Sequence, residues 1–310
     1  MIYTITLNPA LDRTLWVDKM RPDDSNPIER EERYAGGKGI DVSKVLTTLG
    51  VRNKALGFVG GFTGEELEGL LLNDGIACDF VRISGETRTN IIVNDMTIGT
   101  QTVFNAPGPR IKPYELMQMM YKIERLEEPD IVAISGSLPP GIHPEIYRKV
   151  TEMAKSRGAR IILDTDGEAL KAGIGGFPNA IKPNVHELSR LVDAELDTMA
   201  EIITAARGVR QQGVEIVLVS MGAKGILLVG EKEQYLASPP NVEVKNTIGA
   251  GDSAVGGFVF GLAQAKSPKD ALIYAVAAGT ATTLRPGTAL CEKDDFLRLV
   301  PQIKLQKVEE

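Results

Sequence analysis

Short apolar segments rich in β-branched residues alternate along the chain with longer amphipathic segments. The apolar segments are bounded by Gly, Pro, Asn or Asp, which predicts buried strands over residues 2–7, 131–135, 161–164, 180–182, 216–220 and 226–229. The amphipathic segments predict helices over 39–49, 65–72, 114–126, 144–157, 184–192, 199–212, 253–265 and 268–284. This alternation predicts an α/β fold with a mainly parallel sheet covered by helices on both faces.

A second pattern predicts a smaller sheet. Residues 14–18, 29–34, 80–83, 89–94 and 100–105 alternate apolar with polar positions, and most have no helix between them. A half-exposed sheet with little core of its own would suit a lid over a ligand. No repeat or Gly/Ser linker interrupts the chain, so we expect a single domain over 1–310, with lid strands from about 12–35 and 80–106.

Composition narrows the function classes. The chain has 310 residues, with 35 Lys+Arg against 41 Asp+Glu, a net charge of −6 and only 5% aromatic residues. Without a basic cluster, this argues against a nucleic-acid groove or a membrane-surface patch. The longest weakly polar run, residues 271–284, is shorter than the roughly 20 residues of a membrane span.

The cysteines and histidines argue against zinc or redox chemistry. Cys78 and Cys291 lie far apart, and neither His143 nor His186 combines with them at a zinc spacing. The N-terminus shows no signal-peptide pattern. We therefore expect a reduced, cytoplasmic setting.

The first of three loops that carry chemistry covers residues 35–43, AGGKGIDVS, and precedes a predicted helix. Its glycines let backbone N–H groups approach a sugar or a phosphate closely. It is not a Walker A loop, because Lys38 is followed by Gly39 rather than Ser or Thr. A tight turn without function is the alternative.

The second loop, residues 246–253, reads NTIGAGDS. The amides of Gly249, Ala250 and Gly251 at a helix start would bind a developing phosphoryl group, and Asp252 beside them could act as general base. A helix N-cap is the alternative role for Asp252. The loop also fits the dinucleotide fingerprint G-x-G-x-x-A, but Asp270, about 20 residues on, falls inside a predicted helix rather than after a strand.

The third loop, residues 181–187, reads IKPNVHE and runs from a strand into a helix. Asn184 and Glu187 lie three residues apart, where they could orient waters around Mg²⁺ near nucleotide phosphates. A capping pair at the helix start is the alternative.

Together these loops resemble a known family. The segments GGKGIDVSKVLTTLG, TRTN at 87–90, SGSLPPG at 135–141, KPN..E at 182–187 and NTIGAGDS follow the order and spacing of the PfkB (ribokinase-like) carbohydrate kinases. Three further features, TLNPALD, SGSLPPG and ATTLRPGTALCEKDD, resemble the phospho-sugar branch, which holds 1-phosphofructokinase, tagatose-6-phosphate kinase and the minor 6-phosphofructokinase.

The resemblance implies a three-layer α/β/α fold with a β-sheet lid that forms the contact of a homodimer. It implies that Asp252 is the catalytic base, with the anion hole at Gly249–Gly251. Positions that match the sugar-phosphate site are Asp12, Asn26, Gly36, Gly37, Lys38, Asp41, Arg88, Asn90 and Ser137. Positions that match the ATP and magnesium side are Lys182, Asn184, Glu187, Ser220, Gly222, Gly225 and Thr247.

Two positions depart from the family pattern. Asp41 stands where the family usually has Asn, which replaces a donor and acceptor by a carboxylate. Residues 25–27, Ser-Asn-Pro, lack the basic residues of some 6-phosphofructokinases, whereas Asn26 and Lys38 look more like the 1-phosphofructokinase and tagatose-6-phosphate branch.

The expected activity is ATP-dependent phosphorylation of a ketohexose phosphate, foremost fructose 1-phosphate to fructose 1,6-bisphosphate. Fructose 6-phosphate and tagatose 6-phosphate remain alternative acceptors. An NAD-dependent oxidoreductase and a sugar-phosphate binding protein without turnover are alternatives of another class.

Overall fold

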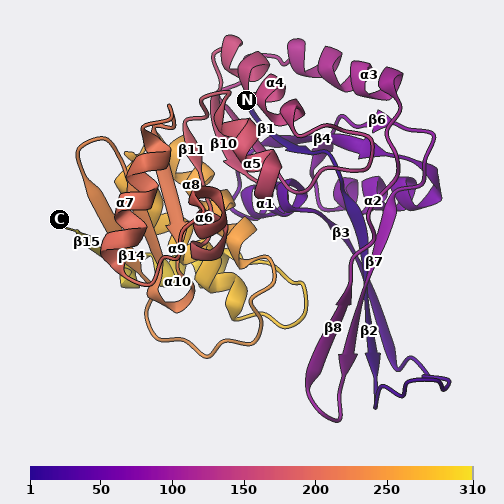
Figure 1. Ribbon diagram of the computed structural model, residues 1–310. Helices are drawn as coiled ribbons and strands as arrows, with labels where there is room; N and C mark the ends of the chain where they lie inside the picture. The colour runs from indigo at the N-terminus through magenta and orange to yellow at the C-terminus, as the bar shows by residue number, and fades with distance from the viewer. Residues whose placement is uncertain (309–310) are drawn as a thin grey trace.

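The computed structural model describes residues 1–308, which form one large sheet between two helical layers and one small sheet (Figure 1). The large sheet has 11 strands in the order β15-β14-β13-β12-β11-β10-β9-β1-β4-β5, with β6 paired to β4. Their bounds are β1 Ile2–Thr6, β4 Asn53–Val59, β5 Ala77–Cys78, β6 Val81–Arg82, β9 Ile131–Ser135, β10 Arg160–Asp164, β11 Ala180–Ile181, β12 Ile216–Ser220, β13 Ile226–Val229, β14 Gln234–Ser238 and β15 Lys304–Lys307. The pairs from β5 to β12 are parallel, and those from β12 to β15 are antiparallel. The predicted α/β class and its mainly parallel sheet are confirmed.

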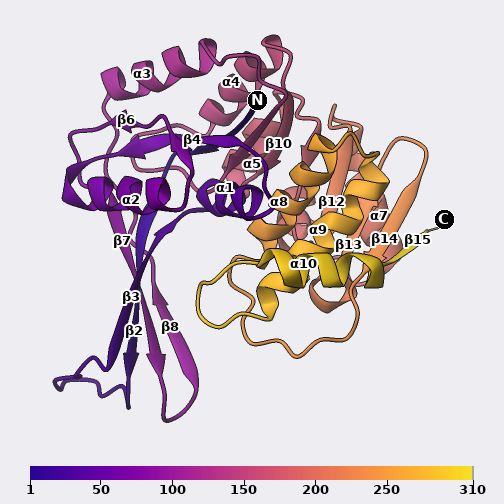
Figure 2. The ribbon, with the colours of Figure 1, turned by 180° about the vertical axis from the view of Figure 1, so that it is seen from behind.

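Helices cover both faces of this sheet, as Figures 1 and 2 show from opposite sides. One face packs α3 Pro113–Glu124, α4 Glu145–Ser156, α5 Gly167–Ile174, α6 Val185–Val192 and α7 Met199–Arg210. The other packs α1 Lys38–Thr48, α2 Gly61–Asn73, α8 Ala250–Ala263, α9 Pro268–Thr283 and α10 Lys293–Leu299. Alternate residues of β9 show the division, because Val132 packs with Tyr147 of α4 whereas Ile131 packs with Phe258 of α8.

The small sheet is built from β2 Ala10–Val17, β3 Arg30–Gly36, β7 Arg88–Asp95 and β8 Thr100–Phe104, in the order β3-β2-β7-β8. It projects away from the large sheet (Figure 1). β8 is exposed along its whole length. Because β2 follows β1 directly and β3 leads into α1, the base of the small sheet lies beside the first glycine loop.

Several predicted elements need correction. Residues 80–83 were expected in the small sheet, but β6 pairs in parallel with β4 at the edge of the large one. The pattern also missed β4, α5, β14, β15 and α10. β4 is buried on both faces apart from Lys54, so it lacks the alternation that marked the exposed strands, and its sequence NKALGFV has only one of the β-branched residues that marked the buried ones.

The parallel strands end at one edge of the large sheet. From β1 the chain crosses to β4 on one side and later to β9 on the other, so the strand order reverses at β1. In open α/β sheets such a reversal opens a crevice outside the carboxyl ends of the strands, where ligands bind. The three loops predicted to carry chemistry, residues 35–43, 181–187 and 246–253, all lie at this edge.

Candidate active site

Two helices of the same layer begin at the crevice. α1 starts after Gly37, whose φ is 124°, and α8 starts after Gly249, whose φ is 74°. Side chains other than glycine rarely adopt these conformations, so glycine permits both tight entries. The helices touch closely, because a methyl group at Gly256 would lie 2.7 Å from Val45 Cγ1. The two N-termini are thereby held on the same side of the crevice.

Asp252 lies in the first turn of α8 and is partly buried. Its burial raises its pKa to about 6, with Asp164 and Glu187 adding to the effect and the positive charges of Lys38 and Lys182 opposing it. At neutral pH the carboxylate is therefore ionised yet able to accept a proton, as a general base must be. The structure shows no side-chain N-cap bond for α8, whose cap is Gly249.

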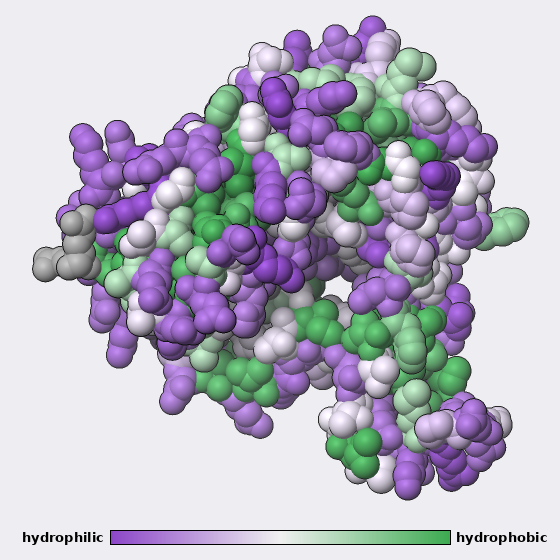
Figure 3. All heavy atoms as spheres, viewed as in Figure 1, coloured by the Kyte–Doolittle hydropathy of each residue, from purple (hydrophilic) through white to green (hydrophobic). Residues whose placement is uncertain are grey.

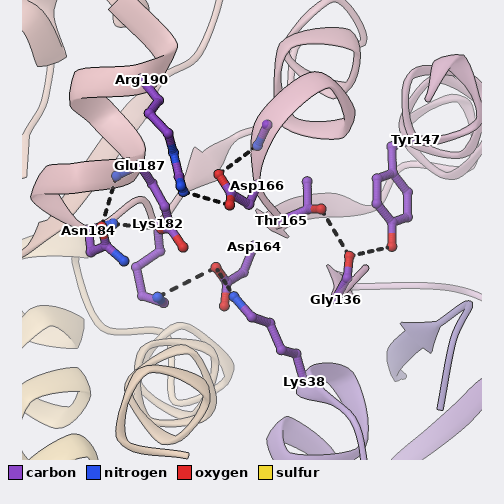
Figure 4. A network of polar contacts seen from close by, with 11 residues as sticks. Lys38, Gly136, Tyr147, Asp164, Thr165, Asp166, Lys182, Asn184, Glu187 and Arg190 are labelled. Atoms are coloured by element: carbon purple, nitrogen blue, oxygen red, sulfur yellow. Dashed lines mark hydrogen bonds and ion pairs between the residues drawn. The ribbon is translucent and has the colours of Figure 1, made fainter. Parts of the chain in front are cut away.

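Two lysines meet one buried carboxylate behind Asp252. Lys38 Nζ lies 3.4 Å and Lys182 Nζ 3.5 Å from Asp164 Oδ1, as Figure 4 shows. Asp164, together with the charges of Asp252 and Glu187, raises the pKa of Lys38. Asp164 was not among the predicted site residues. The sequence could have indicated Asp164, because it is the last residue of a predicted buried strand and the carboxyl ends of parallel strands are where ligands bind.

The base of the small sheet contributes a carboxylate–amide pair. Asp12 of β2 stands opposite Asn90 of β7, whose Nδ2 donates to Asp12 Oδ1 at 2.8 Å. Burial raises the pKa of Asp12, while the bond from Asn90 opposes the increase. A methyl group at Gly36 would lie 2.1 Å from Asp12 Oδ2, so glycine there leaves the room that this carboxylate occupies. Such a pair can hydrogen-bond sugar hydroxyls.

Asp41, in the first turn of α1, brings a third carboxylate to the crevice. Burial raises its pKa well above the ordinary value, and the negative charges of Asp252 and Asp12 raise it further, while Lys44 opposes them. The charges of Asp12 in β2 and Asp252 in α8 therefore both act on Asp41 in α1.

Arg88 is fixed by the backbone around it. Its Nη1 donates to Ala106 O at 2.8 Å and its Nη2 to Asn8 O at 2.9 Å. The Asn8 amide in turn donates to Ser137 Oγ at 3.3 Å, which joins the loops after β1 and β9. Arg88 also lines a pocket of about 740 Å³ with Arg110, and a half-buried guanidinium in such a position suits a phosphate.

The third loop forms a capping box. Asn184 Oδ1 accepts from Glu187 N at 2.8 Å, and Glu187 Oε2 accepts from Asn184 N at 2.8 Å. The alternative of a capping pair is thus confirmed, whereas a magnesium role stays a prediction. Within residues 1–308 no group of three or more His, Cys, Asp or Glu side chains could hold a metal ion.

The remaining predicted nucleotide-side positions lie on neighbouring loops. Ser220 ends β12, and its N–H donates to Pro183 O at 3.0 Å, beside Lys182. Gly222 and Gly225, with φ of 58° and 102°, form the turn into β13, and Thr247 precedes α8. A methyl group at Gly225 would lie 1.9 Å from Ala237 O, so the turn itself explains this glycine.

Asn26, in contrast, lies away from the crevice. It lies in the loop between β2 and β3, at the end of the small sheet away from the large one (Figure 1). Its side chain accepts from Arg21 N and donates to Arg21 O and Asp24 O, so it orders the loop.

The dinucleotide alternative is wrong. Asp270 lies in the first turn of α9, and its carboxylate accepts from the hydroxyl of the N-cap residue Ser267 at 2.6 Å. It therefore cannot bind a ribose after a strand as the fingerprint requires.

A partly buried carboxylate beside a glycine-rich helix start and two lysines, at the carboxyl edge of a parallel sheet, is an arrangement that suits phosphoryl transfer. The family model "pfkB family carbohydrate kinase" matches residues 5–295, and the chain belongs to that family. It is a carbohydrate kinase, and its predicted family membership is confirmed.

Curated relatives match along the whole chain. A 1-phosphofructokinase of Bacillus subtilis is 34% identical, covering 99% of this chain and 100% of its own. An ATP-dependent 6-phosphofructokinase isozyme 2 of Escherichia coli is 36% identical, covering 96% and 97%. The crystal structure of phosphofructokinase-2 from Escherichia coli in complex with substrates and products superposes with a TM-score of 0.92 at 35% identity, covering 97% of this chain and 98% of that one.

Within residues 1–308, no helix is both long and apolar enough to cross a membrane. The cytoplasmic setting expected from the cysteines stays a prediction.

Proposed function

We propose that the protein is an ATP-dependent kinase of fructose 1-phosphate that forms fructose 1,6-bisphosphate. The observation that carries the proposal is the position of Asp252, a partly buried carboxylate at the start of α8. On the proposed acceptor side its charge acts on Asp41, on which Asp12 also acts, and on the proposed phosphoryl side it is influenced by Lys38 and Lys182. The first side suits a polyhydroxylated acceptor, and the second suits a phosphoryl group.

Relatives support the choice of acceptor. Relatives named 1-phosphofructokinase include those of Bacillus subtilis at 34% and Borreliella burgdorferi at 35% identity. The isozyme 2 relative of Escherichia coli, named for 6-phosphofructokinase activity, is 36% identical and keeps fructose 6-phosphate as the second candidate. Tagatose 6-phosphate is the third, on the sequence resemblance alone.

The residues suggest the following mechanism. Asp252 accepts the proton of the acceptor's primary hydroxyl as its oxygen attacks the γ-phosphorus of ATP, and the bond from the γ-phosphorus to the bridging oxygen of the β-phosphate breaks, so that ADP leaves. The amides at the start of α8 and the ammonium groups of Lys38 and Lys182 stabilise the negative charge on the transferred group. Arg88 holds the phosphate that the acceptor already carries. When the small sheet lies over the acceptor, water is excluded, which suppresses hydrolysis of ATP.

A magnesium ion fits the donor set of the third loop. Mg²⁺ prefers oxygen ligands and keeps several waters, so Glu187 and Asn184 could hold it through those waters. The bound ion would neutralise phosphate charge.

The small sheet is the proposed contact of a homodimer. Its exposed apolar side chains gather in its loops and on β8, where Figure 3 shows green atoms at the lower right. These side chains are Met20, Ile28, Met96, Ile98, Val103 and Phe104. Such a patch marks an interaction surface. In a homodimer, Asn26 of one copy could reach the active site of the second copy. Sedimentation velocity tests this, and a monomer at assay concentration would contradict it. One neighbouring structure is described as a tetrameric inhibited form of phosphofructokinase-2.

A coupled assay of ADP formation tests which ketose phosphate is the acceptor. Fructose 1-phosphate, fructose 6-phosphate and tagatose 6-phosphate are compared at equal ATP concentration. Release of inorganic phosphate is measured in the same samples as a control for hydrolysis of ATP. We expect the highest kcat/KM with fructose 1-phosphate. A higher kcat/KM for another ketose phosphate would make that compound the acceptor in place of fructose 1-phosphate. If none of the three gives ADP, the alternative of a sugar-phosphate binding protein without turnover is favoured.

A further inference from the structure

The role of Asp164 is not accounted for by the fold. It ends β10, its side chain is fully buried, and both of its ion pairs lead to lysines (Figure 4). Its Oδ2 has no hydrogen-bond partner in the chain up to residue 308. The helix that follows is capped by Asp166 instead. A buried carboxylate with one oxygen unpartnered is costly, so its retention points to a task in the crevice.

The two lysines come from different parts of the chain. Lys38 is the first residue of α1, whereas Lys182 follows β11. A methyl group at Gly251 would lie 3.3 Å from Lys182 Nζ, so this ammonium group reaches the start of α8. Both charges also act on Asp252. Asp164 is therefore the shared anchor of the two cations that act on the base.

We propose that Asp164 is a positioning residue, which holds Lys38 and Lys182 so that both ammonium groups point at the phosphoryl group during its transfer. The inference rests on the proposed kinase reaction. Without the carboxylate, two like charges near 3.5 Å from a common atom repel each other and move apart. The site then keeps its positive charge for ground-state anions but loses the geometry that the transition state needs.

The test separates kcat from KM. In Asp164→Asn we expect kcat to fall about 10- to 100-fold, because displacement of a charge-stabilising group by about 1 Å is enough for such a loss. KM for ATP and for the ketose phosphate should stay within about twofold or decrease, because the change removes a negative charge from an anion site. A role only in stability would instead lower Tm and leave the folded enzyme's kcat unchanged.

A matched control lies two residues away. Asp166→Asn makes the same chemical change at an exposed carboxylate that pairs with Arg190 at 2.6 Å and contacts neither lysine. We expect this variant to keep the parent's kcat. Equal kcat for Asp164→Asn and Asp166→Asn would overturn the proposal.

A second readout does not need turnover. Because Asp164 raises the pKa of Lys38, loss of the carboxylate should speed modification of Lys38 by trinitrobenzenesulfonate at pH 8, measured by peptide mass spectrometry. Unchanged reactivity would refute the anchoring. An inactive parent enzyme would overturn the proposed function instead, so the two failures can be told apart.

Asp164→Glu covers the case in which the Asn variant does not fold. It keeps the charge but moves it by one methylene group, so a positioning role predicts a lower kcat at unchanged KM. Parental kcat in folded Asp164→Glu would contradict the proposal, because it would show that the position of the charge does not matter.

Discussion

The two sides of Asp252 differ in how their charges are balanced. On the phosphoryl side, Asp164 is matched by Lys38 and Lys182 within 3.5 Å. On the proposed acceptor side, the charges of Asp12 and Asp252 act on Asp41 with Lys44 as the opposing charge, and burial raises the pKa of both Asp12 and Asp41. The phosphoryl side is thus organised before ligands bind, whereas the acceptor side has carboxylates that a hydroxylated substrate would satisfy.

Asp252→Asn should break this arrangement most strongly. The amide cannot accept the proton, so we expect kcat to fall by at least about 100-fold, the lower range for loss of a general base. Binding of the ketose phosphate, measured by calorimetry, should stay largely intact, because the fold around α8 is unchanged. Asp270→Asn, at the equivalent first-turn position of α9, is the control and should retain activity. Near-normal turnover in Asp252→Asn would remove this residue from the role of base.

Arg88→Ala tests the acceptor side alone. Loss of hydrogen bonds to a charged phosphate costs about 1.5–3 kcal/mol, so KM for the ketose phosphate should rise about 10- to 100-fold. KM for ATP should change little. Arg82→Ala removes an arginine that pairs with Glu68 at the edge of the large sheet and should leave both constants unchanged. Equal increases in the two KM values would reject the assignment of Arg88.

The dependence of kcat/KM on pH in the acid range reports on Asp252, the residue between the two sides. With its pKa raised to about 6, Asp252 becomes protonated as pH falls, so kcat/KM should drop about tenfold per pH unit below that value. Lys38 lowers the pKa of Asp252, so in Lys38→Met the midpoint should move to higher pH by about one unit.

The phosphate of the free substrate titrates identically in assays of the parent and of Lys38→Met. The difference between the two pH profiles therefore comes from the protein. Lys171→Met, which removes an exposed lysine paired with Glu168, should leave the midpoint in place. A midpoint that moves to lower pH in Lys38→Met would show that Lys38 does not act on the base.

The sequence patterns indicated the helix starts on the proposed phosphoryl side but not the ion pairs that connect its residues. The glycine loops and Asp252 are local motifs, so their composition indicated helix starts and an anion site. Asp164 was missed because its meaning depends on partners from α1 and from the loop after β11, which only the parallel strand order brings together. The capping box of Asn184 and Glu187 shows the converse, since a local pattern was sufficient to predict the contact.

On the acceptor side, sequence patterns were less reliable. Residues 80–83 were wrongly assigned to the small sheet, because short alternation does not reveal which sheet pairs with a two-residue strand. The opposed pair of Asp12 and Asn90 depends on the parallel register between β2 and β7, whose strands are about 70 residues apart, and such long-range pairing leaves no local signal.

Asp41→Asn gives the smallest expected effect and tests the acceptor side most directly. The pKa of Asp41 is raised in the folded protein, so folding takes up a proton that the unfolded chain has already released. The protonated carboxyl is compatible with folding at low pH. As the pH rises through the pKa of the folded state, this part of the stability is lost. Asparagine removes the penalty of the buried charge. The variant should therefore be more stable than the parent by about 1 kcal/mol at pH 8, raising Tm by about 2 °C, with no gain near pH 4.

Thermal unfolding at both pH values measures the difference, and Asp74→Asn, an exposed C-cap of α2, should show no such pH-dependent gain. A variant of Asp41 that is less stable than the parent at pH 8 would mean that this carboxylate is satisfied without substrate. The acceptor side would then be organised in advance as fully as the phosphoryl side, and the contrast between the two would reduce to the sign of their charges.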